Sequence, residues 1–173
     1  MKKILVIEDM PDVRENIQEL LEISGYQVVA APDGAEGVDA AIEERPDLIL
    51  CDVMMPRLDG FTVLNILSKR PETSDVPFVF LTAKTEREDF RKGMNLGADD
   101  YITKPFSKDE LLDVIESRLA KSERLRNFNK TEESLSAFIN EARGYEELKK
   151  LSNDRRIKHY KKRDLIFEEG DSE

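Results

Sequence analysis

The chain has 173 residues, 39% of them hydrophobic, which is enough for one ordinary domain with an extension. Its formal net charge of −10 argues against nucleic-acid binding by this chain alone, because contacts to phosphates require a basic surface. There is one cysteine, no apolar run long enough to span a membrane and no signal-peptide pattern, so we expect a cytoplasmic protein without a membrane segment.

Residues 1 to about 122 alternate short apolar runs with segments of helical spacing. The runs cover 3–7, 26–30, 47–51, 76–81 and 101–102. Apolar runs without alternation are typical of strands covered on both faces. Helical stripes of apolar residues occupy 13–21, 38–42, 61–67, 90–96 and 111–119. Five strands alternating with five helices predict an α/β domain with a parallel, doubly wound sheet.

Helix boundaries carry their own signals. Gly25 and Gly97 follow the first and fourth stripes and are expected to end those helices. Ser107 is followed three residues later by Glu110, which predicts a capping box at the start of the fifth helix.

Three carboxylates follow two of the predicted strands. Glu8 and Asp9 come directly after the first apolar run, and Asp52 comes directly after the third. The carboxyl ends of parallel strands form the ligand-binding edge of an open α/β sheet, so we expect these side chains to meet there. At about 4 Å and an effective dielectric of about 20, each pair would repel by on the order of 4 kcal/mol. A hard cation such as Mg²⁺ would stabilise the cluster and keep waters for a phosphate, which predicts metal-assisted phosphoryl chemistry.

From about residue 120 to 151 no strand signal appears. Apolar residues recur at intervals of three, four or seven, at Leu125, Phe128, Leu135, Phe138, Ile139, Ala142, Tyr145, Leu148 and Leu151. The spacing predicts an amphipathic helix, continuous or interrupted near residues 127–131, that acts as a linker. Its apolar stripe either packs on a second copy of the chain or folds back on its own domain.

Four blocks of residues resemble the receiver domain of two-component response regulators. They are Glu-Asp at 8–9, Asp-Val-Met-Met-Pro-Arg-Leu-Asp-Gly at 52–60, Thr-Ala-Lys at 82–84 and Asp-Tyr-Ile-Thr-Lys-Pro-Phe at 100–106. Their order and spacing match the family over residues 2 to about 122. The resemblance implies a receiver (phosphoacceptor) domain at 1–122, a flavodoxin-like sheet of strand order 2-1-3-4-5, and a helical linker and possible dimerisation helix at 123–151.

The resemblance also implies a role for each residue of the acidic site. Asp52 would accept a phosphoryl group from a sensor histidine kinase or a histidine phosphotransfer protein. Mg²⁺ would be held by Glu8, Asp9, Asp52 and the main-chain carbonyl of Met54. Lys104 would pair with a phosphoryl oxygen as a point charge. The domain would not be an enzyme beyond the phosphorylation and dephosphorylation of its own Asp52.

Two further residues would form the switch of such a domain. The hydroxyl of Thr82 would donate to a phosphoryl oxygen, and the ring of Tyr101 would turn inward in response. The movement would alter the face formed by the fourth helix, the fifth strand and the fifth helix. A homodimer through this face, through the linker helix or through both is the expected consequence.

The last segment, residues 152–173, changes character. Residues 161–171 resemble the opening of cyclic-nucleotide-binding jelly-roll domains, as in the Crp/Fnr transcription regulators, although Arg163 stands where that family often has glycine. We expect either the truncated start of an effector domain or a disordered charged tail. Neither a nucleotide-binding set nor a helix-turn-helix is present, so the expected output is transcription regulation by an attached domain and not DNA binding by this fragment.

Two other functions stay open at this point. The chain could be a receiver-like interaction module that does not accept phosphate. It could also be a Mg²⁺-dependent aspartyl phosphatase of the haloacid-dehalogenase kind. That family, however, has a second acid two residues after its nucleophile, and this chain has Met54 at that position.

Overall fold

The computed structural model describes residues 1–83 and 93–141 of the chain, with side chains through residue 131. The chain divides into two compact units, Met1–Glu123 and Arg124–Glu173. The elements in chain order are β1 (Lys3–Ile7), α1 (Pro11–Ile23), β2 (Gln27–Ala31), α2 (Gly34–Glu44), β3 (Leu48–Asp52), α3 (Gly60–Ser68), β4 (Phe78–Ala83), β5 (Asp100–Lys104) and α5 (Lys108–Glu141). No helix within these described ranges is long and apolar enough to cross a lipid bilayer.

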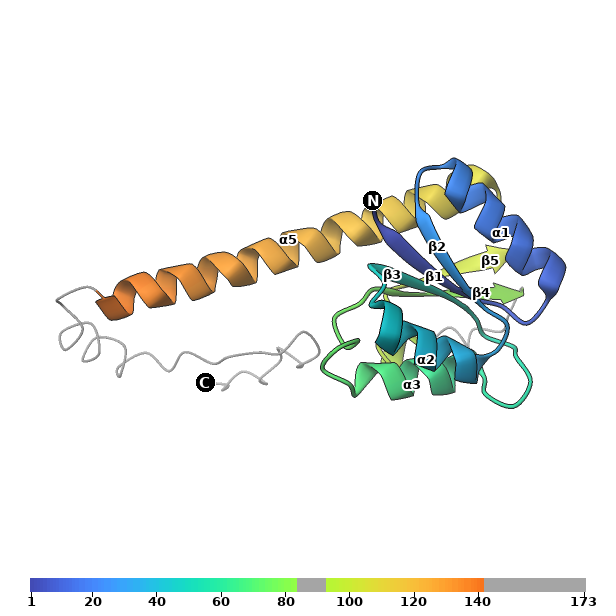
Figure 1. Cartoon of the computed structure of the whole chain (residues 1–173), viewed down its shortest axis with the longest axis horizontal. Coiled ribbons are helices and arrows are strands. Elements are labelled where there is room, and N and C mark those ends of the chain that lie inside the picture. The colour runs from blue at the N-terminus through green and yellow to red at the C-terminus, as the bar shows by residue number, and fades with distance from the viewer. Residues whose placement is uncertain (84–92, 142–173) are drawn as a thin grey trace, which may run out of the picture. The chain divides into compact units, whose positions relative to one another are not determined.

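The five strands form one parallel sheet in the order β2-β1-β3-β4-β5, which confirms the predicted fold (Figure 1). Each strand lies within two residues of the apolar run that predicted it. The chain moves from β1 to β2 on one side and then returns to β3 on the other side of β1. The carboxyl ends of β1 and β3 therefore flank the point where the strand order reverses, which is where open α/β sheets bind ligands.

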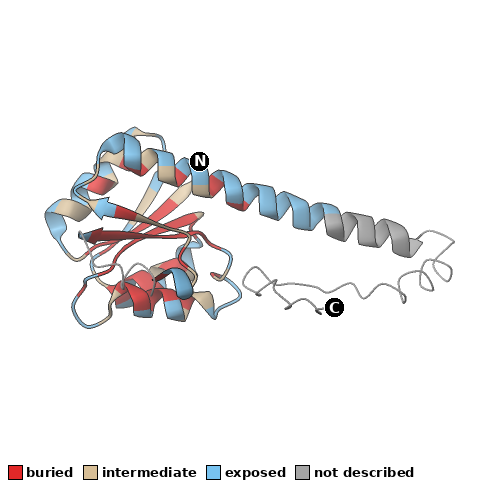
Figure 2. Ribbon diagram, turned by 180° about the vertical axis from the view of Figure 1, so that it is seen from behind, coloured by how far each residue is buried: buried red, intermediate tan, exposed pale blue. Residues whose placement is uncertain are grey.

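Burial differs between the central and the edge strands (Figure 2). All residues of β3 are buried, as are all but the first of β1 and all but the last of β4. The edge strands β2 and β5 are only partly covered, with Ala30 and Thr103 exposed. The prediction of strands covered on both faces is thus right for the centre of the sheet and wrong for its edges, because an edge strand has a neighbour on one side only.

Each face of the sheet has its own hydrophobic core, with α2 and α3 on one face and α1 and the first turns of α5 on the other (Figure 1). On the first face, Leu64 and Leu67 of α3 pack in one cluster with Phe78 and Phe80 of β4. On the second, helix residues that include Leu21, Leu111 and Ile115 pack in one cluster with β1, β3 and β4. Burying one such side chain contributes about 1.5–3 kcal/mol, so the two helix layers hold the carboxyl ends of the strands in a defined position.

The helix ends show which local signals operate. The capping box is confirmed: the amide of Glu110 donates to Ser107 Oγ at 3.2 Å, and the amide of Ser107 donates to Glu110 Oε2 at 2.8 Å. Asp33 caps α2: its Oδ1 accepts from the amides of Ala35 and Glu36, both at 2.9 Å.

Helix α5 is continuous from Lys108 to Glu141, so the interruption considered near residues 127–131 is absent. The hydroxyl of Thr131 donates to the carbonyl of Asn127 at 2.9 Å, a bond to the preceding turn that is compatible with helix. Leu125 and Phe128 are exposed. The rest of the predicted linker, 142–151, and the predicted effector start, 152–173, lie outside the described residues.

Helix α2 ends in a left-handed residue that is not glycine, Arg45, with φ 46° and ψ 63°. A Cβ in this conformation crowds the following carbonyl and costs about 1–2 kcal/mol. We therefore expect Arg45→Gly to raise the free energy of unfolding by about 1 kcal/mol in urea titrations. Arg45→Ala removes the same charge but keeps the Cβ and should give no comparable gain, so equal gains from both variants would contradict this explanation.

Candidate functional site

The three predicted carboxylates meet at the carboxyl edge of the sheet. Glu8 and Asp9 follow β1, and Asp52 is the last residue of β3. One carboxylate oxygen of each lies within 4.8 Å of the others. Glu8 is fully buried, Asp52 is 6% exposed and Asp9 is half-buried, so the cluster is open to solvent mainly on the Asp9 side.

Backbone contacts orient these carboxylates. The amide of Glu8 donates to the carbonyl of Ala31 at 3.1 Å and so ties the end of β1 to β2. Oε1 of Glu8 accepts from the amide of Met10 at 3.3 Å. In the same way, Oδ1 of Asp52 accepts from the amide of Met54 at 3.3 Å. Each side chain is held by an amide two residues later in its own loop, which leaves its second oxygen for other partners.

An arginine that the sequence analysis missed also holds the first loop. Arg14 lies in α1, and its Nη1 donates to the carbonyl of Glu8 at 2.8 Å and to that of Asp9 at 3.5 Å. An arginine in the first turn of a helix that follows two acids was the available signal. Its contacts are with main-chain carbonyls, which no side-chain motif reports.

Lys104 brings a positive charge into the cluster from the end of β5. Its Nζ lies 2.6 Å from Oε2 of Glu8 and 3.1 Å from Oδ2 of Asp52. The peptide bond that follows, Lys104–Pro105, is cis. One ammonium therefore joins acids from two strands and offsets part of their mutual repulsion.

Burial and charge act in opposite directions on these groups. Burial raises the pKa of Glu8, the hydrogen bond from Lys104 lowers it, and the net pKa is raised. For Lys104, burial alone would lower the pKa, but the hydrogen bond to Glu8 and the charge of Asp52 outweigh burial and leave the pKa raised. Lys104 therefore stays protonated and remains an electrostatic partner for an anion.

The two predicted switch residues lie on neighbouring strands. Thr82 is buried near the end of β4, and its hydroxyl donates to the carbonyl of Ala83 at 2.8 Å. Tyr101 is half-buried on β5, and its ring centroid lies 5.0 Å from that of Phe80. The two residues are thus placed on the strands that pair through Thr82 and Thr103.

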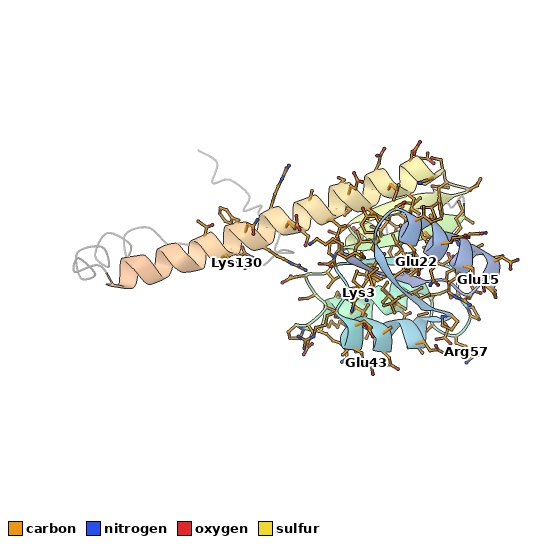
Figure 3. All side chains as sticks on the ribbon, turned by 45° about the horizontal axis from the view of Figure 1, so that its top comes forward. Lys3, Glu15, Glu22, Glu43, Arg57 and Lys130 are labelled. Atoms are coloured by element: carbon orange, nitrogen blue, oxygen red, sulfur yellow. The ribbon has the colours of Figure 1, made fainter. Side chains whose placement is uncertain are left out.

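The loop after Asp52 depends on a close backbone approach. A Cβ on Gly60 would overlap the carbonyl oxygen of Asp52 and lie 3.0 Å from Cε1 of Phe80. The amide of Gly60 donates to the carbonyl of Val53 at 3.0 Å. In the same loop Arg57, labelled in Figure 3, is exposed and adopts a positive φ of 68°. A sequence pattern does not report this close contact between Gly60 and the aspartate.

The family model for the response regulator receiver domain matches residues 4–116, which contain the three carboxylates and all of the five strands except the first residue of β1. The chain belongs to the response-regulator receiver family. Domains of this family interact with histidine kinases or phosphotransfer proteins and are not generally enzymes acting on separate substrates.

Similar proteins agree with this assignment. The receiver is 39% identical over 136 residues to the DNA-binding dual master transcriptional regulator RpaA of Synechocystis sp., covering 79% of this chain and 56% of RpaA. It is 46% identical over 122 residues to the transcriptional regulatory protein PhoP of Bacillus subtilis, covering 70% of this chain and 50% of PhoP. The chain thus spans about half the length of these two relatives.

Among solved structures, the receiver domain of the sensor histidine kinase PA1611 from Pseudomonas aeruginosa has a TM-score of 0.65 and 31% identity to this chain. The match covers 69% of this chain and 98% of that domain. That structure has a magnesium ion coordinated in its active-site cleft.

The acidic cluster of this receiver fits a hard divalent cation. Glu8, Asp9 and Asp52 supply only oxygen donors, and their ligand atoms converge within 4.8 Å. Mg²⁺ prefers one or two carboxylates together with waters and phosphate oxygens, which suits a cluster that is open on one side. The donor set contains no thiolate or imidazole that would favour zinc or copper.

We expect Mg²⁺ to stabilise this receiver through the cluster. At a free concentration ten times its dissociation constant, binding adds about 1.4 kcal/mol to the free energy of unfolding. Asp9→Asn should raise that dissociation constant about tenfold or more, since changes even outside the ligands cost that much. Urea titrations in Mg²⁺ and in EDTA measure the difference. Asp12→Asn, which removes an exposed charge in the first turn of α1, is the control, and an equal loss in both variants would exclude a specific site.

Proposed function

We propose that this receiver accepts a phosphoryl group on Asp52 and works as a phosphorylation-dependent switch. One observation carries the proposal: the ammonium of Lys104 contacts both Glu8 and Asp52 at the carboxyl edge of a receiver sheet. This arrangement combines a candidate nucleophile, a metal-binding set and a cation for the transferred anion. The nucleophile, the metal-binding residues and the lysine lie at the ends of strands or in the first loop residues after them.

The donor in this proposal is a phosphohistidine of a sensor kinase or a histidine phosphotransfer protein. A carboxylate oxygen of Asp52 attacks phosphorus, the phosphorus–nitrogen bond breaks, and its electron pair returns to the imidazole of the donor. The product is an acyl phosphate, which water later hydrolyses to regenerate the carboxylate. Bound Mg²⁺ would offset the charge on the phosphoryl oxygens, and its proposed ligands are Glu8, Asp9, Asp52 and the carbonyl of Met54.

Lys104 has a second role in this proposal. Its ammonium pairs with carboxylates in the absence of phosphate and would exchange one of them for a phosphoryl oxygen after transfer. A phosphoryl group brings a charge of about −1.5 to −2 and three acceptor oxygens, so it competes well for a protonated lysine. The raised pKa of Lys104 supports this role because the side chain keeps its charge at neutral pH.

Thr82 and Tyr101 are the proposed switch. The hydroxyl of Thr82, which now donates to Ala83, would turn to a phosphoryl oxygen. That movement would increase the population in which the Tyr101 ring lies over Phe80, the inward position that it has in this structure, and would alter the surface around β5 and α5. The mechanism is a population shift between two arrangements, driven by the differential affinity of the phosphorylated site for one of them.

The output in this proposal is transcription regulation by an attached effector. Two relatives that this chain matches over about half of their length are transcriptional regulators, one of them DNA-binding. Helix α5 beyond residue 122 would connect the receiver to that effector. Residues 152–173 would be the first residues of the effector domain. The net charge of −10 supports the view that this chain does not bind DNA alone, and the single cysteine supports a cytoplasmic location.

Dimerisation is the proposed means of transmission. The surface around β5 and α5, the extended α5 with its exposed Leu125 and Phe128, or both would form the contact. We expect Mg²⁺ with beryllium fluoride, an acyl-phosphate mimic, to shift the chain toward dimer in sedimentation velocity. An unchanged sedimentation coefficient, together with unchanged NMR signals from α5, would contradict transmission through this helix.

Incubation with acetyl phosphate and Mg²⁺, followed by intact mass spectrometry, tests the central proposal. We expect one phosphate per chain in Mg²⁺ and none in EDTA. No adduct in either condition would favour a receiver-like interaction module that does not accept phosphate. Steady turnover of many small phosphate esters would favour an aspartyl phosphatase instead.

A further inference from the structure

The ring of Tyr101 occupies space that exists only because residue 93 has no side chain. Gly93 is buried, and the backbone at residues 93–95 is helical. A Cβ built on Gly93 would overlap the hydroxyl oxygen of Tyr101, and it would lie 2.6 Å from Cζ of Tyr101 and 3.0 Å from Cε2 of Phe80. Real Cβ atoms essentially never show contacts this short, so any larger residue at 93 requires a neighbour to move.

The surroundings determine which neighbour can move. Phe80 is fully buried, and its ring lies 5.2 Å from that of Phe61 and 5.1 Å from that of Phe78, measured between centroids. It is therefore fixed by close packing on several sides. Tyr101 is half-buried and lies on the edge strand β5. Of the two rings that meet the added Cβ, only Tyr101 has a route to solvent.

We propose that Gly93 is a positioning residue for the receiver switch: its missing side chain is what admits the ring of Tyr101 to the inward position over Phe80. This inference rests on the proposed function, in which the position of Tyr101 carries the signal from Asp52. With alanine at 93, the inward arrangement is blocked whether or not the aspartate is modified. The ring of Tyr101 is then held away from Phe80 by sterics, in a more exposed position that we call outward.

The test measures how exposed the Tyr101 ring is in the full chain. Tyrosines labelled with carbon-13 at the ε positions give one signal per ring, and Tyr101→Phe assigns the signal of Tyr101. A neutral, soluble gadolinium chelate broadens signals according to their exposure. In the wild-type chain we expect weak broadening of the Tyr101 signal. In Gly93→Ala we expect broadening close to that of free labelled tyrosine in the same buffer, with and without Mg²⁺ and beryllium fluoride.

Asn95→Ala is the matched control. Asn95 is exposed in the same helical segment, so this variant adds an alanine without adding a Cβ near Tyr101. It should leave the Tyr101 signal unchanged. A second comparison does not depend on NMR: Gly93→Ala should lower the urea midpoint less in a Tyr101→Ala background than in the wild-type background, because the overlapping ring is gone. Alanine is the better helix former, so a steric loss is not explained by helix propensity.

The outcomes separate this inference from the proposed function. Equal shielding of Tyr101 in Gly93→Ala and the wild type would overturn the inference. So would an equal loss of midpoint in the two backgrounds. The amount of phosphate accepted by Asp52 should be the same in Gly93→Ala as in the wild type, since the atoms nearest to a Cβ at residue 93 belong to Tyr101 and Phe80 and not to the acidic cluster. If the wild-type chain accepted no phosphate, the proposed function would be contradicted. The difference in Tyr101 exposure between Gly93→Ala and the wild type would still support the steric role of Gly93.

Discussion

Asp52→Asn is expected to abolish phosphate acceptance from acetyl phosphate completely, to below the detection limit of intact mass spectrometry. The amide keeps the size of the side chain but lacks the anionic oxygen that attacks phosphorus. Because Asp52 is almost fully buried beside Glu8, removal of its charge also relieves repulsion, and Lys104 keeps its shorter contact with Glu8 at 2.6 Å. We therefore expect the metal-free variant to be at least as stable as the wild type in urea, so that a missing adduct cannot be explained by unfolding.

Asp59→Asn is the control for this experiment. Asp59 lies in the same loop and caps α3, where its Oδ1 accepts from the amide of Thr62 at 2.7 Å. Asparagine caps helices about as well as aspartate, so this variant should fold and accept phosphate like the wild type. A phosphate adduct that persists in Asp52→Asn would show that another residue accepts phosphate. Loss of the adduct in both variants would point to an effect of the loop charge and not to a nucleophile.

Gly60→Ala is expected to cause the largest loss of stability among the substitutions considered. The added Cβ would overlap the carbonyl oxygen of Asp52 and lie 3.1 Å from its carbonyl carbon and 3.0 Å from Cε1 of Phe80. A backbone carbonyl at the end of a central strand cannot move aside as the tip of a flexible side chain can. Overpacking of this kind typically costs about 1–3 kcal/mol and occasionally more, and we expect about 3 kcal/mol from urea titrations.

The same substitution should also weaken the site. A shift of the Asp52 backbone moves one carboxylate of the cluster, so we expect less stabilisation by Mg²⁺ and slower acceptance of phosphate than in the wild type. Asn65→Ala, at an exposed position of the same helix, should change stability by less than about 0.5 kcal/mol. If Gly60→Ala matched Asn65→Ala in stability, the close approach between α3 and Asp52 would not be a constraint on the fold.

Much of the fold could be predicted because several levels of the sequence agree. The apolar runs at β1, β3 and β4 lack any polar interruption, and such runs have few stable alternatives to buried strands. The capping box of α5 could be predicted for a similar reason: Ser107 and Glu110 bond to the backbone of their own helix turn and to each other. Signals that act within a few residues need no knowledge of the rest of the chain.

The prediction of helical packing was less complete. Met94 was assigned to the apolar stripe of the fourth helix, but it is 43% exposed, and Phe90 of the same stripe lies outside the described residues. Asp33, which caps α2, was not predicted to begin a helix. The spacing of apolar residues identifies the buried face of a helix only when the length of the helix and the elements that pack on it are known. For a short segment, the sequence gives neither.

The sequence by itself determined the alternation of strands and helices, the acids that follow β1 and β3, and the resemblance that implied Lys104, Thr82 and Tyr101 as their partners. Tertiary structure alone decided the contacts that join residues far apart in the chain. The bridge from Lys104 to Glu8 spans 96 positions, and the space for Tyr101 depends on Gly93 in a separate segment. The physical reason is that periodicity and caps are local properties of the chain, whereas ion pairs and close approaches depend on where the strand order brings segments together.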